Sequence, residues 1–206
     1  VVAEARRLGA EAAAFPLAFD DLAALPGRLD ALAALRPRWD VLVHNASAYA
    51  PSPLPELTAE RALRDYAVNA AGPLLLSARL APVLARSALP GGGSIVAMAD
   101  VHALGRPRRG YASYSMSKAA LVEMVRSLAR DLAPLVRVNA VAPGVVAWPE
   151  SGRESEAEAQ RAYLERVPLA RPGTPEDAAK AVRWLALDAA YVTGEVVRVD
   201  GGRSLG

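Results

Sequence analysis

The sequence predicts an α/β fold with a parallel, doubly wound sheet in three layers, and two observations support this. Short apolar runs of strand length alternate along the chain with segments in which leucine and alanine have helical spacing. Strands that alternate with helices of this length are joined by parallel crossovers. The runs are apolar almost throughout, which is typical of strands covered on both faces. We therefore expect a Rossmann-like domain with its ligand crevice at the carboxyl ends of the strands.

The expected elements follow one another in order along the chain. The expected strands are 12–19, 39–44 (WDVLVH), 94–99 (SIVAMA), 135–141 (LVRVNAV) and 196–199. The expected helices are 21–35, 58–88, 112–133, 155–167 and 175–187. Thr58 is a good N-cap for the helix that follows it, and Pro134 ends the helix before it. No repeat or linker divides the chain, so residues 1–206 are expected to form a single domain.

The amino-terminal residues do not match the usual start of such a fold. Val1 to Gly9 has the pattern of the last turns of a helix ended by glycine. A dinucleotide-binding domain begins with a strand, a glycine-rich turn and a helix, and neither G-x-G-x-x-G nor G-x-x-x-G-x-G occurs in the sequence. We therefore expect the domain to lack its first strand-helix-strand. The loop at 150–160 is polar and charged, and we expect it to act as a lid.

Composition argues against several classes of function. The formal net charge is +2 and the pI is about 9.1 without a basic stripe, so nucleic-acid binding is not expected. The chain has no cysteine, and its two histidines, His44 and His102, are far apart, so no metal site is expected. Neither an apolar run of membrane-spanning length nor a signal peptide is evident, so we expect a cytoplasmic protein without a membrane partner.

One pair of residues carries the chemistry that the sequence predicts. Of the 24 basic residues only Lys118 and Lys180 are lysine, and Lys118 follows Tyr114 by four residues. On a helix this spacing places both side chains on one face. The ammonium would favour the phenolate and lower the pKa of the tyrosine, which makes the phenol a usable proton donor. A tyrosine on the surface of an amphipathic helix is the alternative.

Seven segments in order resemble the short-chain dehydrogenase/reductase family. They are HNAS (44–47), Asn69, SIVAMAD (94–100), YSMSK (114–118), VRVNAVAPG (136–144), RPGTPEDAA (171–179) and YVTGEVVRVDGG (191–202). The resemblance implies a nicotinamide cofactor contacted by Asp21 (or Asp20), Leu22, Asn45, Ala46, Ser47, Tyr114, Lys118, Pro143 and Gly144. It further implies that Tyr114 protonates the substrate, that Lys118 binds the nicotinamide ribose, and that Asn69 holds a water in the proton relay.

An aspartate stands beside the position at which most of this family has a serine. That position, 13 residues before Tyr114, holds Val101, and Asp100 precedes it. This departure resembles the pteridine reductases, which combine an aspartate with the tyrosine and the lysine. An aromatic residue stacks on the pterin in that subgroup, and Tyr49 falls in the matching loop, while Tyr111 matches another tyrosine of the site. The resemblance implies a substrate site formed by Ser47, Tyr49, Asp100, Tyr111 and Tyr114.

The expected function is the NADPH-dependent reduction of a pterin, such as dihydrobiopterin or dihydrofolate. Hydride would be delivered to the carbon of a C=N bond, and Tyr114 would protonate the ring nitrogen. Two alternatives stay open: reduction of another carbonyl compound, such as a 3-oxoacyl thioester, ketone or sugar, and an inactive fragment. NADPH as the donor and a homotetramer with helices 58–88 and 112–133 at an interface are implied by the resemblance alone.

Overall fold

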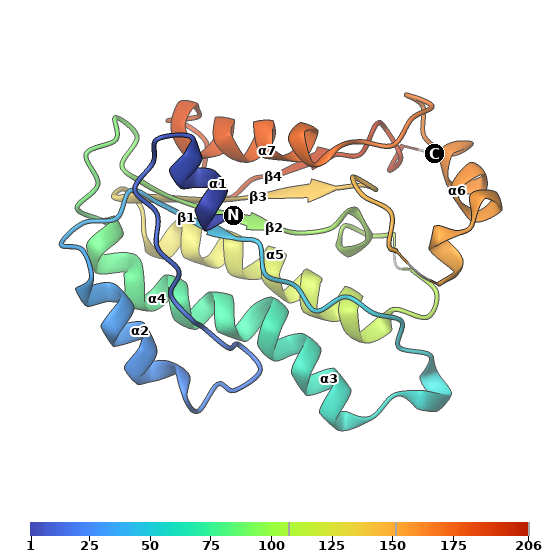
Figure 1. The fold of residues 1–206 in the computed structure, drawn as a ribbon, viewed down its shortest axis with the longest axis horizontal. Coiled ribbons are helices and arrows are strands. Elements are labelled where there is room, and N and C mark those ends of the chain that lie inside the picture. Colours follow the sequence, from blue (N-terminus) through green and yellow to red (C-terminus); the bar gives the residue numbers. More distant parts are fainter. Residues whose placement is uncertain (107, 151, 206) are drawn as a thin grey trace.

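A computed structural model describes residues 1–106, 108–150 and 152–205. The centre of this structure is a parallel sheet with the strand order β1-β2-β3-β4 (Figure 1). Its strands are β1 (Val41–His44), β2 (Gly93–Met98), β3 (Val136–Pro143) and β4 (Val196–Val199). Each strand pairs in parallel with the next along the chain. Every connection is therefore a crossover, and the expected parallel sheet is confirmed.

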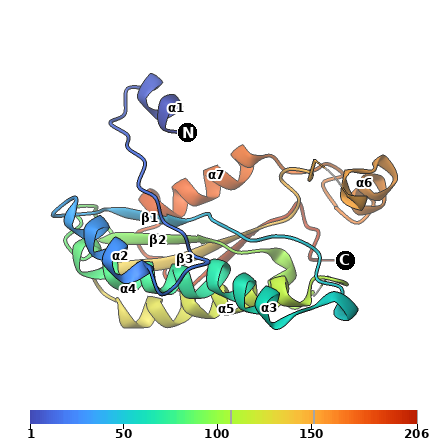
Figure 2. The ribbon, with the colours of Figure 1, turned by 60° about the horizontal axis from the view of Figure 1, so that its bottom comes forward.

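Helices cover both faces of this sheet, as Figure 2 shows. One face carries α2 (Leu25–Ala34), α3 (Ala59–Tyr66), α4 (Gly72–Leu84) and α5 (Ala112–Asp131), and the other carries α7 (Pro175–Arg183). The short α6 (Ala157–Leu164) lies beyond the carboxyl ends of the strands (Figure 1). The remaining helix, α1 (Val2–Arg7), stands apart and buries none of its residues (Figure 2). The expected three layers are confirmed.

The residues of β2 show why the strands are apolar throughout. Ile95 and Ala97 belong to the larger core, which is shared with α2, α4 and α5, whereas Val96 packs with Leu185 on the opposite face. Each of these side chains is fully buried. Successive side chains of a strand point to opposite faces, so a strand between two helical layers needs apolar residues at every position.

The stretch predicted as one helix at 58–88 contains a change of helical type. It runs as α3, a π-helical turn at Ala67–Ala71 and α4, and its N-cap Thr58 accepts a hydrogen bond from Arg61 N at 3.2 Å. Contrary to our reading of the sequence, Ala59–Leu84 is long and apolar enough to span a membrane by length and composition alone. Half of its most apolar window is buried, and it packs on α2, α5 and the sheet, as a core helix does.

The prediction of a strand at 12–19 is wrong. These residues form an irregular segment between α1 and α2, and among the described residues β1 pairs with β2 alone. A strand needs a partner for its backbone groups, and Pro16 has no amide hydrogen to offer one. Leu17 and Phe19 are apolar for another reason, since both pack against the larger core.

Candidate active site

Polar and aromatic side chains gather where β1, β2 and β3 end, next to the first turn of α5. Asp100 follows β2 by two residues, Pro143 closes β3, and Tyr114 lies at the start of α5. The carboxyl ends of parallel strands meet at one edge of a sheet, so residues far apart in sequence come together there. Together with Tyr49 and Gly144, these three residues line a cavity of about 310 Å³.

Asp100 supplies the polar group of this site, whereas Val101 contributes only an apolar side chain to the cavity wall. The Tyr114 hydroxyl donates a hydrogen bond of 2.8 Å to Asp100 Oδ2. The other carboxylate oxygen, Oδ1, accepts from His102 N at 2.7 Å and so caps the short 3-10 turn after β2. Val101, at the position of the family's serine, is buried in the larger core. The carboxylate is therefore fixed by the backbone and directed at the tyrosine.

The surroundings of Tyr114 raise its pKa, which is opposite to the lowering expected from the sequence. Burial of the phenol is the main cause, and the charge of Asp100 and its hydrogen bond act in the same direction. Lys118 Nζ lies 5.9 Å from the centroid of the Tyr114 ring and donates instead to Met98 O at 2.8 Å. The spacing of the pair places both side chains on one face, but it does not bring the ammonium to the hydroxyl. Tyr114 therefore keeps its proton at neutral pH in this structure.

Lys118 is a buried cation with hydrogen-bonding capacity to spare. Its side chain is 2% exposed, and burial lowers its pKa to about 8, although the charge of Asp100 acts in the opposite direction. An ammonium group has three N–H donors, and within the described part of the chain Met98 O is its one acceptor. Two donors remain next to the ring of Tyr114, and this donor set fits a ribose diol.

Three tyrosines form one aromatic cluster beside the carboxylate. The ring of Tyr49 stacks on Tyr111, with centroids 5.2 Å apart and planes at 22°, and meets Tyr114 at 4.9 Å and 80°. Tyr111 covers one face of the Tyr49 ring, so a flat substrate can stack on Tyr49 only from the opposite face. The residues expected to contact the substrate are thus brought together, and their contact with a substrate stays a prediction.

Two charged residues that we did not single out in the sequence complete the cluster. The Glu154 carboxylate accepts from Tyr49 OH at 3.0 Å and from Tyr111 OH at 2.8 Å, and it forms an ion pair with Arg108. The Arg108 guanidinium also lies 4.4 Å from the centroid of the Tyr111 ring. Glu154 belongs to the polar loop expected to act as a lid, of which residue 151 lies outside the described structure. That loop was the only signal of its role in the sequence.

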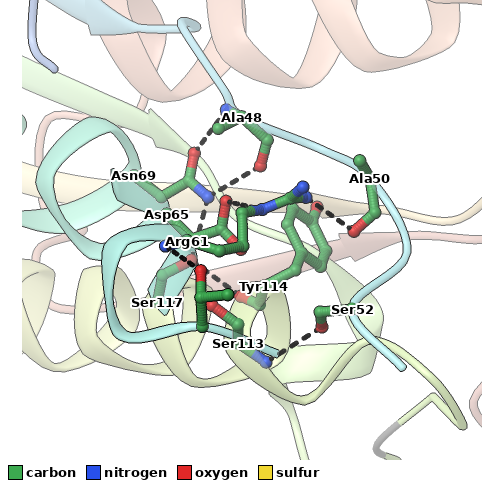
Figure 3. Close-up of polar contacts among 10 residues, drawn as sticks. Ala48, Ala50, Ser52, Arg61, Asp65, Asn69, Ser113, Tyr114 and Ser117 are labelled. Carbon is green, nitrogen blue, oxygen red and sulfur yellow. Dashed lines mark hydrogen bonds and ion pairs between the residues drawn. The ribbon is translucent and has the colours of Figure 1, made fainter. Parts of the chain in front are cut away.

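Asn69 holds the loop after β1 against α5 (Figure 3). It is fully buried in the π-helical turn, and its Oδ1 accepts from Ala48 N at 2.8 Å. Its Nδ2 donates to Ala48 O at 2.9 Å and to Ser117 Oγ at 2.8 Å. Both amide hydrogens are therefore used within the protein. These contacts show that Asn69 positions the loop that carries Tyr49. That Asn69 holds a water in the proton relay stays a prediction.

A second set of hydrogen bonds holds the same loop a few residues further along the chain (Figure 3). Asp65 is 1% exposed and accepts from Arg61 Nε at 3.0 Å, and Arg61 Nη2 donates to Ala50 O at 3.2 Å. Ser113 N donates to Ser52 Oγ at 3.4 Å, which joins the loop to the start of α5. The loop is thus tied to the helix layer at successive points, which fixes Tyr49 beside Tyr114.

The residues expected to bind the cofactor fall into two groups. Asn45, Ala46 and Ser47 are exposed where β1 ends, on the same edge of the sheet as Pro143 and Gly144. A Cβ added to Gly144 would lie 3.1 Å from the Asp200 Cα atom, so this turn packs closely against the segment after β4 and favours glycine.

Asp21 and Leu22 lie in the turn before α2. Asp21 Oδ1 accepts from Ala24 N at 3.2 Å, and Leu22 packs against the larger core. These contacts give both residues a structural role, and their contact with the cofactor stays a prediction.

Comparisons with known proteins match most of the chain. The family model described as enoyl-(acyl carrier protein) reductase matches residues 1–204. Glucose 1-dehydrogenase of Gluconobacter oxydans is 35% identical over 169 residues, which are 81% of this chain and 62% of that protein. The 3-oxoacyl-[acyl-carrier-protein] reductase of Thermotoga maritima is 36% identical over 166 residues, 79% of this chain and 65% of that protein. The chain thus spans less than two thirds of the length of these two relatives.

Solved structures show the same similarity. The crystal structure of acetoin dehydrogenase from Enterobacter cloacae has a TM-score of 0.83 at 32% identity and covers 99% of this chain and 79% of its own. Acetoin dehydrogenase from Salmonella typhimurium also gives 0.83, at 28% identity, over 100% of this chain and 81% of its own.

Proposed function

The chain belongs to the short-chain dehydrogenase/reductase family, and from this premise we propose that it carries an oxidoreductase activity that depends on NAD(P)H. The observation that carries the proposal is the meeting of Tyr114, Lys118 and Asp100 at the carboxyl edge of the sheet. A proton donor and a carboxylate that line one cavity, next to a buried cation, are the groups that a reduction by hydride and proton transfer requires.

The residues at this edge fit a nicotinamide nucleotide, which supplies the hydride when it is bound. The two spare N–H groups of Lys118 suit the ribose hydroxyls, and the Pro143-Gly144 turn forms an adjacent wall. We propose NADPH as the form used, on the basis of the resemblance to the pteridine reductases.

The protein's own part in the reaction is to hold and move a proton. Tyr114 keeps its proton until substrate binds, because burial and Asp100 raise its pKa. Transfer of that proton to the substrate leaves a phenolate, whose charge the Lys118 ammonium offsets. Asp100 accepts the hydrogen bond of the hydroxyl at 2.8 Å, so it lies where it can take up a proton from solvent and pass it to the phenolate after each turnover.

The finer proposal is that the substrate is a pterin. Reduction of its C=N bond adds hydride to carbon and a proton to nitrogen, and Tyr114 supplies the proton. Asp100 supports this because a carboxylate can accept hydrogen bonds from the amino and ring N–H groups of a pterin. Tyr49 and Tyr111 support it because aromatic rings stack favourably on a flat conjugated substrate.

Reduction of a carbonyl compound is the second candidate, and the relatives favour it. Their names refer to glucose, acetoin and a 3-oxoacyl thioester, each of which contains a carbonyl or the hydroxyl group formed from one. In that reaction Tyr114 would protonate the carbonyl oxygen. Asp100 would hydrogen-bond to Tyr114 and would not contact the substrate.

A substrate panel separates the two candidates. We expect the protein that contains this chain to oxidise NADPH with dihydrobiopterin at a kcat/KM at least about tenfold above that with acetoin or a 3-oxoacyl thioester. Asp100→Ser, which restores the family's usual side chain close to its position, should lower pterin turnover more than carbonyl turnover. Turnover of the carbonyl compounds without any of the pterin would reject the pterin proposal and favour the second candidate.

We also propose a homotetramer, with the α3, α4 and α5 surfaces at one interface. Exposed apolar side chains lie on these helices: Leu63 is 68% exposed, Tyr66 50%, Leu74 41% and Met116 72%. Apolar side chains grouped on a surface are typical of an interface with another chain. Light scattering coupled to size exclusion should give four times the mass of one chain, and the mass of a single chain would refute the proposal.

A further inference from the structure

A second cavity opens beside the one that contains Tyr114. Its volume is about 430 Å³, and its walls share Arg108, Glu154 and Tyr163 with the catalytic cavity. The two spaces are therefore adjacent parts of one depression beneath α6. A substrate whose reacting carbon lies at Tyr114 can extend into the second space.

The walls of this second cavity are strongly basic. Five basic side chains line it: His102, Arg108, Arg109, Arg166 and Arg203. Glu154 is the one acidic side chain among the described residues that line it, and it is already paired with Arg108. The remaining positive charge therefore has no counter-charge within the cavity.

Three of these arginines lack an acidic partner. Arg109 and Arg166 are exposed and form no ion pair with any described residue. The Arg203 guanidinium lies 5.3 Å from the centroid of the Tyr163 ring, and its Nε is buried without a hydrogen-bond acceptor in the described structure. A buried N–H without an acceptor is unfavourable, and a carboxylate or phosphate is the acceptor that a guanidinium binds best.

We propose that this basic cavity binds an anionic group, a carboxylate or a phosphate, at the non-reacting end of the substrate. The inference rests on the proposed reductase function and narrows it to acidic substrates. Both candidate substrates have such forms, because a pterin can carry a glutamate tail and the thiol-derived part of a thioester can carry a phosphate at its far end. The site binds the anion, and the reaction at Tyr114 is the same with either tail.

Binding measured by calorimetry, without cofactor or turnover, tests the proposal. Two probe pairs are used, and in each the second member lacks the anionic group of the first: p-aminobenzoylglutamate and its dimethyl ester, and phosphopantetheine and pantetheine. We expect at least one acid to bind about tenfold more tightly than its neutral partner, and that acid identifies the anion as carboxylate or phosphate. Raising the salt concentration should weaken this preference.

Substitutions in the cavity wall locate the effect. The double variant Arg109→Gln/Arg166→Gln should reduce the preference for the acid to about twofold or less, while Arg130→Gln, an exposed arginine on α5, should leave it unchanged. Each of three results would overturn the proposal. The acidic and neutral probes could bind equally well, the preference for the acid could survive the double substitution, or Arg130→Gln could lose that preference to the same extent. Because no turnover is measured, these results are independent of whether the reductase function holds.

Discussion

Tyr114→Phe is expected to lower kcat/KM by a factor of about 10³ and to leave the fold intact. Positioned proton transfer contributes about 10² to 10⁴ to a rate, and the Tyr114 hydroxyl is the group in the cavity that holds a proton and is fixed by Asp100 at 2.8 Å. The ring stays in the aromatic cluster in the variant, so substrate stacking is retained. Steady-state kinetics with whichever substrate the panel identifies measure the effect, and the main change should be in kcat.

Tyr49→Phe is the matched control for this substitution. It removes a hydroxyl from the same cluster, which is bonded to Glu154 and Arg108 rather than to Asp100. We expect a loss of less than about tenfold, seen mainly in KM, because the ring remains for stacking. If Tyr114→Phe turned over as well as Tyr49→Phe, the assignment of Tyr114 as the proton donor would be wrong.

Lys118→Met should abolish most of the turnover and leave the protein at least as stable at neutral pH. Burial lowers the pKa of Lys118 from 10.5 to about 8, so below pH 8 the folded state holds the ammonium at a cost of about 3 kcal/mol. Methionine removes that cost and loses the bond to Met98 O, worth about 1–3 kcal/mol. We expect kcat/KM to fall by about 10² or more, because the phenolate loses its neighbouring cation.

The same pKa shift gives the wild-type protein a pH-dependent stability. Between pH 8 and 10.5 the unfolded lysine is protonated and the folded one is not, so the unfolded state binds more protons and stability rises with pH. The buried tyrosines, whose pKa values are raised, act in the opposite direction near pH 10, but they titrate alike in the wild type and in Lys118→Met. Denaturant unfolding of both proteins across this range should therefore show the wild type gaining about 3 kcal/mol relative to Lys118→Met.

Lys180→Met is the control, since Lys180 is an exposed lysine paired with Glu176 at 3.3 Å. It should keep both the pH dependence and the activity of the wild type. A pH dependence that persisted unchanged in Lys118→Met would show that another group causes it.

The layers and the parallel sheet could be predicted because they depend on local patterns. A strand covered on both faces must be apolar at each position, so the run at 94–99 identifies β2 without knowledge of its neighbours. The meeting of Asp100 with Tyr114 also follows from the sequence, because both lie at the same edge of a parallel sheet.

The parts that escaped prediction depend on distances between segments far apart in sequence. Glu154 meets Tyr49 across 105 residues, and nothing in the spacing of either residue indicates that contact. The direction of the pKa shift of Tyr114 depends on its burial and on Asp100, and helical spacing alone reveals neither. The segment at 12–19 has the composition of a strand, but a strand also requires a neighbour to pair with.

The way the cavity is enclosed separates the residues proposed to recognise the substrate from those proposed to transfer the proton. Tyr114 and Lys118 stand on a long helix that packs against the sheet, whereas Arg108 and Glu154 belong to connecting segments outside α5 and the strands. Connecting segments tolerate replacement and insertion better than packed elements do. A lineage of such proteins can therefore acquire a new substrate by exchanging these two segments while it inherits the proton-transfer apparatus intact.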